Sequence, residues 1–236
     1  MKVIFGGPTL YGARLPPSPD YELRPPAKQG DFHEAIQGGA TVIGLIDGIY
    51  EYVPAIWHKE ILFGLSQGVC IYGAASMGAL RAVECAAFGM VGIGKIYQDF
   101  ADGVLEDDAE VAQSHGPSEL GFLPLSEPLV NVRATLARCL HLELITSAEH
   151  DHLLTTAQAI FFKDRTYKSL ASAAITDRGR ASEVLAILLE NNLNQKLRDA
   201  EMLIETVIDT PNTRNLPRPG WRFEKTSVWE AVFPSR

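Results

Sequence analysis

The chain has few cysteines, no long hydrophobic run and no excess of basic residues. Its three cysteines, Cys70, Cys85 and Cys139, lie in apolar segments without Cys-x-x-Cys spacing. This pattern argues against a disulfide framework or a zinc site and indicates a reducing compartment. No apolar stretch approaches the ~20 residues that span a bilayer, and the short apolar start is expected to form a first strand and not a signal peptide. We therefore expect a cytoplasmic protein without membrane association.

Basic charge is scarce as well. Lys and Arg number 21 against 29 Asp and Glu, a net charge of −8, which gives no support to nucleic-acid binding. The acidic residues 106–110, with His115 nearby, are more typical of a solvated face than of a metal site, so we expect neither a metal nor another cofactor. Hydrophobic residues make up 46% of the 236 residues, which is enough for a sizeable core.

Proline and glycine are nearly absent from the later part of the chain. Between residues 129 and 210 there is no proline and one glycine, Gly179, whereas fifteen of the 20 glycines precede residue 95. We therefore expect an α/β unit over residues 1–125, a helical region packed on it over residues 126–210, and a tail over residues 211–236. The four aromatic residues of the tail are expected to dock on the body or on a partner: Trp221, Phe223, Trp229 and Phe233.

Short apolar runs alternate with helix-length segments in the first part. Residues 3–5, 41–46 and 69–72 are apolar throughout, as is typical of parallel strands covered on both faces. Helices are expected at residues 31–37, 54–67 and 77–88, and later near residues 129–142, 148–161, 166–175, 181–191 and 194–208. The proline-rich residues 12–30 should form a long loop. This order predicts an α/β fold, with a small, mostly parallel sheet flanked by helices and followed by a helical C-terminal half.

Residues 70–81 contain the most informative motif, in which a strand enters a turn of small residues and then a helix. Within it, Ala74-x-Ser76-x-Gly78 is a variant of the Gly-x-Ser-x-Gly nucleophile elbow. Ser76 would stand at the helix N-terminus, where the free amide of Met77 can stabilise an oxyanion. The small residues Gly73 and Ala75 would let a substrate approach closely. A serine at this position is also the ordinary N-cap of a helix, so the motif alone leaves both roles open.

A nucleophilic serine needs a base, and no histidine is an obvious one. Lys59 lies in the second turn of the helix predicted after the second strand, above the sheet edge that presents Ser76. Buried there, it would have a lowered pKa and could act as a neutral base; exposed, it would pair with a carboxylate. Asp47 and Thr9 follow the second and first strands and belong to the same edge, where open α/β sheets bind ligands.

Several segments together resemble the TfuA-like core domain. They are Asp47-Gly48, His58-Lys59-Glu60-Ile61-Leu62, residues 73–82, Gly89-Met90 and residues 107–111. The resemblance spans about residues 3–133 and is most specific in the Ser-Met-Gly-Ala-Leu-Arg-Ala sequence that starts at Ser76. Proteins of this family work beside YcaO enzymes, which convert backbone amides of ribosomally made peptides to thioamides.

The resemblance implies a hydrolase that cleaves the C-terminal thiocarboxylate of a ThiS-like sulfur-carrier protein and releases sulfide for a YcaO partner. It maps a Ser–Lys pair onto Ser76 and Lys59. His58 is a further candidate for the site, and Arg81 would either steer the thiocarboxylate or pair with Glu84. The partners it implies are a YcaO-type cyclodehydratase, a ThiS-like carrier and a precursor peptide.

Two other functions remain open from the sequence. A non-catalytic adaptor would dock YcaO and the peptide through the acidic run, the aromatic tail and the helical half. An ordinary serine hydrolase acting on small esters fits the elbow, but the chain lacks an evident histidine–carboxylate pair in the expected order.

Overall fold

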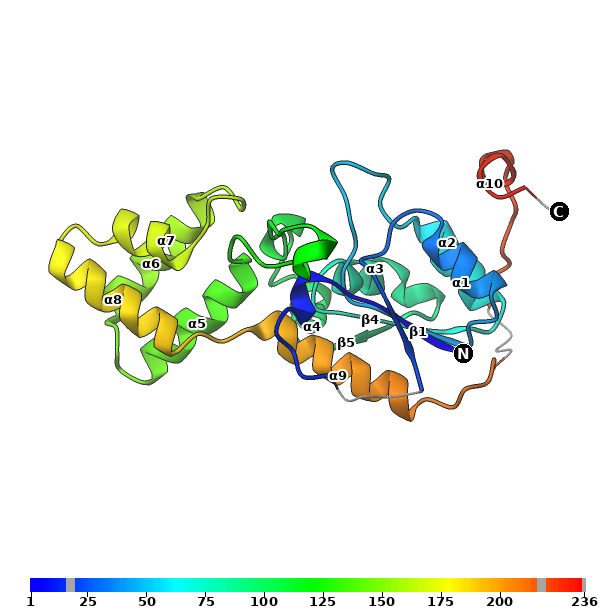
Figure 1. The fold of residues 1–236 in the computed structure, drawn as a ribbon, viewed down its shortest axis with the longest axis horizontal. Coiled ribbons are helices and arrows are strands. Elements are labelled where there is room, and N and C mark those ends of the chain that lie inside the picture. Colours follow the sequence, from blue (N-terminus) through cyan, green and yellow to red (C-terminus); the bar gives the residue numbers. More distant parts are fainter. Residues whose placement is uncertain (16–19, 216–219, 235–236) are drawn as a thin grey trace.

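The computed structural model describes residues 1–15, 20–215 and 220–234 (Figure 1). Its centre is a five-stranded sheet in which every strand pairing is parallel, in the order β2-β1-β3-β4-β5. The strands are β1 (Lys2–Phe5), β2 (Glu22–Arg24), β3 (Val42–Leu45), β4 (Cys70–Ala74) and β5 (Val91–Ile93). The predicted α/β fold with a parallel sheet is confirmed.

Helices cover both faces of this sheet. Successive side chains of a strand point to opposite faces, and so Val3 and Phe5 of β1 join the core on one face while Ile4 joins the core on the other. The covering helices are α1 (Asp31–Gln37), α2 (His58–Ser66) and α3 (Met77–Cys85) on the first face and α9 (Gln195–Asp209) on the second. Burial on both faces explains why these strands are apolar throughout.

Four helices of the later part form a unit of their own, at the left of Figure 1. They are α5 (Leu129–His141), α6 (Ser147–Ala159), α7 (Tyr167–Ala174) and α8 (Arg178–Glu190). Buried side chains such as Leu136, Leu153 and Leu170 hold this unit together. The predicted helical half is confirmed, but its last helix, α9, leaves this unit and packs Leu203 and Val207 on the sheet. Residues 126–210 thus comprise a four-helix unit and a helix that belongs to the α/β unit.

The elements that differ from the prediction are short or begin at a different residue. Those not predicted are β2, β5, α4 (Gly94–Ala101), α10 (Ser227–Val232) and the 3₁₀ turns η1 (Pro8–Leu10), η3 (Asp108–Glu110) and η4 (Ser118–Leu120). The helix predicted over residues 77–88 consists of α3 and the 3₁₀ turn η2 (Ala86–Phe88). Strand β2 lies in the predicted loop of residues 12–30, of which residues 16–19 fall outside the described part. Helix α2 begins four residues later than predicted, because residues 54–55 are held extended by backbone pairing with residues 28–29. Within the described residues, no helix is both long and apolar enough to cross a membrane.

The aromatic tail docks on α1 and α2 of the body. Trp229 of α10 is 2% exposed, and its ring centroid lies 5.2 Å from that of Phe63. His33 of α1 lies edge-on to Trp229 and stacks on Phe233, with a centroid distance of 4.3 Å. Of the two expectations for the tail, the structure shows contact with the body.

Trp229→Ala should lower the free energy of unfolding by about 3 kcal/mol, because a buried indole loses its contacts. Urea unfolding followed by circular dichroism measures this loss. Val228→Ala, on the same helix at a side chain that is 59% exposed, is the matched control and should change stability by less than about 0.5 kcal/mol. Equal midpoints for both variants would show that the tail lies outside the cooperative unit.

Candidate functional site

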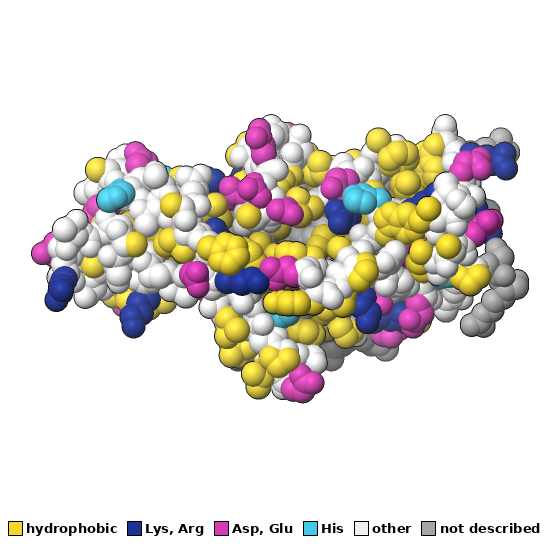
Figure 2. Space-filling model, turned by 90° about the horizontal axis from the view of Figure 1, so that it is seen from above, with side chains coloured by type: hydrophobic (Ala, Val, Ile, Leu, Met, Phe, Trp, Pro, Cys, Tyr) yellow, Lys and Arg dark blue, Asp and Glu magenta, His cyan; other side chains and the backbone are white. Residues whose placement is uncertain are grey.

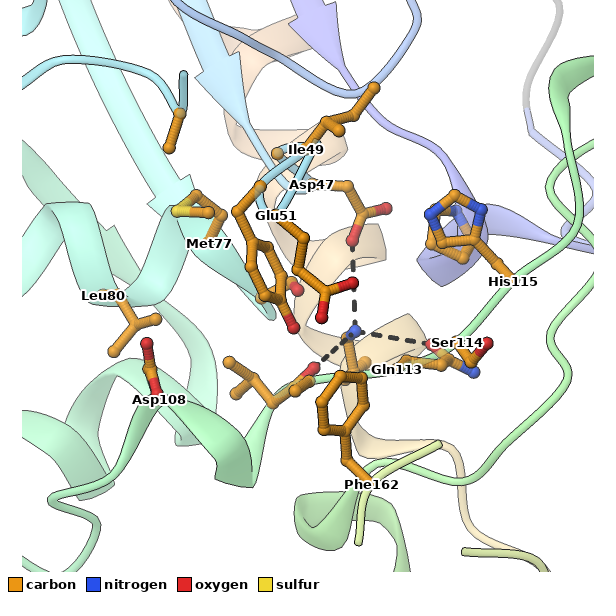
Figure 3. Close-up of a pocket in the computed structure, with 18 of the residues that line it drawn as sticks. Asp47, Ile49, Glu51, Met77, Leu80, Asp108, Gln113, Ser114, His115 and Phe162 are labelled. Carbon is orange, nitrogen blue, oxygen red and sulfur yellow. Dashed lines mark hydrogen bonds and ion pairs between the residues drawn. The ribbon is translucent and has the colours of Figure 1, made fainter. Parts of the chain in front are cut away.

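A cavity of about 470 Å³ opens at the carboxyl ends of β1, β3 and β4. The strand order reverses between β1 and β3, and ligands of open α/β sheets bind at such a switch point. Its walls include Pro8 after β1, residues 47–52 after β3, Ser76 and Met77 after β4, residues 111–115, Phe162 and Lys163 of the helical unit, and Lys196 of α9. Figure 3 shows Met77, Leu80 and Asp108 on one side of the cavity and Ser114 and His115 on the other.

Asp47 and Thr9 come together at this edge, as predicted. Asp47 is 2% exposed, and its carboxylate accepts hydrogen bonds from the amides of Gly7 and Thr9 at 2.9 and 3.1 Å. The Thr9 hydroxyl donates to the other carboxylate oxygen at 2.6 Å. Asp47 therefore fixes the chain that leaves β1 against the end of β3, with Asp47 itself in the cavity wall and Thr9 behind it.

Ser76 follows β4 in a strained turn. Its amide donates to the Ala74 carbonyl at 2.8 Å, and Ala75 between them has a φ of 66°. These three residues form a γ-turn of the rare, strained kind, a conformation that clusters at functional sites. Ser76 occupies the N-cap position of α3, but its side chain makes no capping hydrogen bond, and the residue lines the cavity. The contact that defines an ordinary N-cap is therefore absent at Ser76.

The Met77 amide beside Ser76 is available to a ligand. Within the described residues it donates to no backbone acceptor, whereas the next amide, that of Gly78, donates to the Ile46 carbonyl at 3.1 Å. Met77 also lines the cavity. A free amide next to a serine in a cavity wall is the arrangement that stabilises an oxyanion in acyl transfer.

Gly73 and Ala75 have packing roles in this turn. A Cβ atom at Gly73 would lie 2.1 Å from the Gly78 carbonyl oxygen, and Ala75 is fully buried in the core beneath α9. Neither residue is part of the cavity wall. Their small size therefore permits the tight turn that presents Ser76, and the predicted direct approach of a substrate to them is not seen.

The structure does not bring Lys59 to the cavity. Its ammonium donates to the Thr226 hydroxyl of the tail at 3.0 Å and lies 5.6 Å from the centroid of the Phe223 ring. The later start of α2 places Lys59 in the first turn, whereas the face of this helix that packs on the sheet carries Ile61 and Leu65. The expectation that Lys59 is buried against the sheet beside Ser76 does not hold in this structure.

Arg81 and His58 share one carboxylate at the rim. The Arg81 guanidinium lies 2.6 Å from Glu84 Oε2, and His58 Nε2 lies 2.7 Å from the same oxygen. Arg81 also donates to the Ile56 carbonyl and lines the cavity with Glu84, whereas His58 does not. Both roles considered for Arg81, an ion pair with Glu84 and a place in the site, are thus compatible with its position.

Lys196 and Gln113 are not among the residues predicted for this cavity. Lys196 is 2% exposed, and its ammonium donates to the Val111 carbonyl at 3.1 Å and to Gln113 Oε1 at 3.5 Å. Asp47 Oδ1 lies 4.0 Å away, and the dashed lines in Figure 3 show the three contacts. Burial lowers the pKa of Lys196, and the charge of Asp47 opposes this effect.

The sequence pattern of α9 could have indicated that Lys196 is a buried residue of a polar site. It stands four residues before Ala200 and seven before Leu203 on the apolar face of α9, at the spacing of one side of a helix. Charged side chains are almost never fully buried unless they have partners. A lysine within an apolar stripe therefore marks a buried polar site, although its partners are distant in the sequence.

The mouth of the cavity joins the α/β unit to the helical unit. Lys163, between α6 and α7, forms an ion pair with Glu51 at 2.9 Å, and its ammonium lies 5.5 Å from the Phe162 ring centroid. Tyr52 beside them is 84% exposed, and Figure 2 shows hydrophobic side chains among charged ones in the middle of this face. Burial and the nearby acidic residues raise the pKa of Tyr50 to about 12, so this phenol is protonated at neutral pH.

The acidic run serves local structure. Glu110 binds the Arg133 guanidinium through both carboxylate oxygens, at 2.8 and 3.0 Å, and Asp107 caps η3 through the Ala109 amide. The His115 ring contacts the carbonyl of its neighbour, Gly116. Throughout the described part of the chain, no group of three or more His, Cys, Asp or Glu residues could hold a metal ion.

A family model described as TfuA-like protein matches residues 47–166. The chain belongs to the TfuA-like family. The matched segment covers about half of this TfuA-like chain, includes Asp47, Lys59 and Ser76, and ends before Lys196. TfuA-like proteins are generally partners of YcaO enzymes, so membership is consistent with a role in YcaO-associated thioamidation. The search of curated proteins found no match.

Proposed function

We propose that this TfuA-like protein is an accessory hydrolase of peptide backbone thioamidation. It cleaves the C-terminal thiocarboxylate of a ThiS-like sulfur carrier and releases sulfide for a YcaO partner, whose binding of the peptide it also assists. The observation that carries the proposal is the geometry at Ser76: a hydroxyl without a capping hydrogen bond, on a strained turn, beside the free Met77 amide in a cavity wall.

The cavity suits the end of a chain better than a folded domain. Its volume, about 470 Å³, lies in the usual range for small ligands, about 300–1,000 Å³. An extended carrier C-terminus that enters between Tyr52 and Phe162 would bring its last carbonyl carbon to Ser76, while the folded part of the carrier stays outside. Arg81 in the wall would attract the anionic thiocarboxylate in competition with Glu84, with which it forms an ion pair at 2.6 Å.

The reaction is an acyl transfer through Ser76. The serine oxygen forms a bond to the thiocarboxylate carbon, and the Met77 amide stabilises the oxyanion. The carbon–sulfur bond then breaks, and the proton lost by the serine goes to the sulfur, which leaves as hydrosulfide. Water hydrolyses the acyl-serine to a carboxylate and restores Ser76. A base must carry the serine proton. The resemblance to the family indicates a lysine for this role, and although it maps that lysine onto Lys59, Lys59 lies on the tail, whereas the buried Lys196 lines the cavity with Ser76.

Intact-mass spectrometry of a thiocarboxylated ThiS-like carrier tests the proposal. Incubation with this protein should replace sulfur by oxygen at the carrier C-terminus, a decrease of about 16 Da, with an equal amount of free sulfide. The carrier alone is the control. A carrier whose mass and sulfide remain unchanged would contradict the hydrolase function.

The adaptor alternative predicts a different response to sulfide. If the protein only docks YcaO and the peptide, Ser76→Ala should support thioamidation as well as the unchanged protein does. If it supplies sulfide, Ser76→Ala should stop thioamidation with the carrier as sulfur source, and added free sulfide should restore it. Peptide mass spectra from the reconstituted YcaO reaction distinguish the two functions.

A further inference from the structure

We propose that the loops around the cavity mouth form a docking surface for the folded body of the sulfur carrier, and that this body presents an apolar patch bordered by basic side chains beside its C-terminus. This inference rests on the proposed hydrolysis and adds to it the surface on which the carrier is recognised. It concerns exposed side chains outside the cavity, which no step of the acyl transfer uses.

Three segments surround the mouth of the cavity, on the side of the molecule that Figure 2 shows. They are residues 46–57 between β3 and α2, residues 111–128 between η3 and α5, and residues 160–166 between α6 and α7, and each contributes to the cavity wall. Five of their large apolar side chains are 37–84% exposed, and we call this set the mouth patch: Tyr52, Val53, Leu120, Leu125 and Phe161. Apolar side chains gathered on one exposed surface mark an interaction site.

Aromatic rings from both units of the protein meet in the mouth patch. The Lys163 ammonium lies 6.0 Å from the centroids of both the Tyr52 and the Phe161 rings, and its ion pair with Glu51 holds it there. The patch is therefore continuous across the junction between the α/β unit and the helical unit. Aromatic side chains are enriched in interfaces because they supply a large contact area at a low cost in conformational entropy.

Residues 114–125 add a finger with a fixed base. The Leu125 amide donates to the Ser114 carbonyl at 2.8 Å, and Ser114 lines the cavity. Leu120 lies at the far end of the finger, in η4. Because the base is tied to the cavity wall, a body that contacts Leu120 is held at a fixed position relative to the cavity.

The occupant of the mouth patch follows from what enters the cavity. A space of about 470 Å³ takes the end of a chain, and the folded body attached to that end must then lie against the mouth. A small thiocarboxylate would leave the patch exposed to water. A second copy of this protein fits less well, because its own tail is held on the body through Trp229 and Phe233.

The charge around the mouth indicates the charge of the partner. Four exposed acidic side chains on the loops beside the cavity form no ion pair within the described residues: Glu106, Asp107, Asp108 and Glu119. The two cations of the mouth, Arg81 and Lys163, are each paired with a carboxylate. The excess of negative charge favours a partner with basic side chains around its apolar contact.

Two substrates separate docking from chemistry. One is the thiocarboxylated ThiS-like carrier, and the other is a synthetic peptide of its last six residues with the same thiocarboxylate. Both bring the same reacting group to Ser76, but only the carrier has a body that can contact the mouth patch. We expect kcat/KM for sulfide release to be about tenfold or more higher with the carrier than with the peptide.

Leu120→Ser and Phe161→Ser test the mouth patch itself. Both side chains are exposed and lie outside the cavity wall, so the variants should fold, which circular dichroism checks. Each should raise KM for the carrier by about fivefold, the loss typical of an important interface residue, and leave kcat/KM for the peptide within about twofold. Leu189→Ser is the matched control, since Leu189 is 57% exposed at the end of α8, and it should change neither substrate.

Glu119→Lys and the ionic strength test the charge of the partner. Reversing the charge of Glu119 on the finger should raise KM for the carrier by about threefold, whereas Glu190→Lys at the end of α8 should not. Added salt should raise KM for the carrier more than for the peptide, because it screens the attraction between the body and the acidic loops. A lower KM in Glu119→Lys would overturn a basic partner surface.

Binding measured without turnover keeps this inference apart from the proposed function. Calorimetric titration uses the carrier with its ordinary C-terminal carboxylate, and the two mouth-patch variants should weaken this binding about fivefold. If neither carrier nor peptide releases sulfide, the proposed function fails, and this titration still decides the docking surface. If the hydrolysis stands but the mouth-patch variants leave the carrier's Kd and KM unchanged, or impair carrier and peptide equally, the inference is overturned. It is also overturned if they change only the sedimentation of the protein alone, or only the binding of a YcaO partner.

Discussion

Ser76→Ala should reduce the release of sulfide from a thiocarboxylated carrier by about 10⁴-fold or more. Removing the nucleophile of an acyl-transfer site leaves only the oxyanion site and substrate binding, and losses of this size are typical. The hydroxyl makes no capping contact with α3, so the variant should keep its fold. Initial rates of sulfide release under carrier saturation measure the effect.

Ser114→Ala is the matched control for this experiment. Ser114 lines the same cavity but lies on a loop without the strained turn and without a free helix amide beside it. Its substitution should change the rate by less than about threefold. Equal losses in the two variants would mean that the cavity is sensitive to any change of its wall and would contradict a specific role for Ser76.

Gly78→Ala should lower the free energy of unfolding by about 3 kcal/mol. A Cβ atom at Gly78 would lie 1.8 Å from the Leu45 carbonyl oxygen. This oxygen belongs to the backbone of β3, a central strand that cannot move to relieve the clash. The first turn of α3 would have to move away from β3 and break the hydrogen bond from the Gly78 amide to Ile46. Because that turn carries Ser76 and Met77, sulfide release should fall as well.

Gly116→Ala provides the comparison for Gly78→Ala. An added Cβ atom there would meet its nearest neighbour, Leu120 Cδ1, at 3.6 Å, which is an ordinary van der Waals contact. We expect this variant to remain within about 1 kcal/mol of the unchanged protein. If chemical denaturation gave Gly78→Ala the same free energy of unfolding as Gly116→Ala, this would contradict the close contact between α3 and β3.

Most of the fold could be predicted because its signals are local. The apolar runs at β1, β3 and β4 are long enough to be recognised as buried strands, and α1 was predicted at its observed bounds, Asp31–Gln37. Strand β2 has three residues with little burial, so no apolar run marks it. It exists because β1 offers an open edge to pair with, which is a property of the assembled sheet.

In the candidate site, too, some residues could be placed from the sequence and one could not. Asp47, Thr9 and Ser76 each follow a strand, and parallel strands bring their carboxyl ends to one edge whatever else the chain does. Their meeting could therefore be predicted. Lys59 could not be placed in this way, because its direction depends on where α2 begins, and backbone pairing of residues 54–55 with residues 28–29 delays that start.

The sequence by itself determined the parallel sheet, the helical half and the turn that carries Ser76, because apolar periodicity and small residues act over a few neighbouring positions. Only the tertiary structure decided which lysine enters the cavity. Lys196 lies 120 residues beyond Ser76 in the sequence, and it comes to Asp47 because the apolar stripe of α9 must be buried on the second face of the sheet. Burial of this stripe is favourable because the hydrophobic effect depends on the apolar area removed from water and not on distance along the chain.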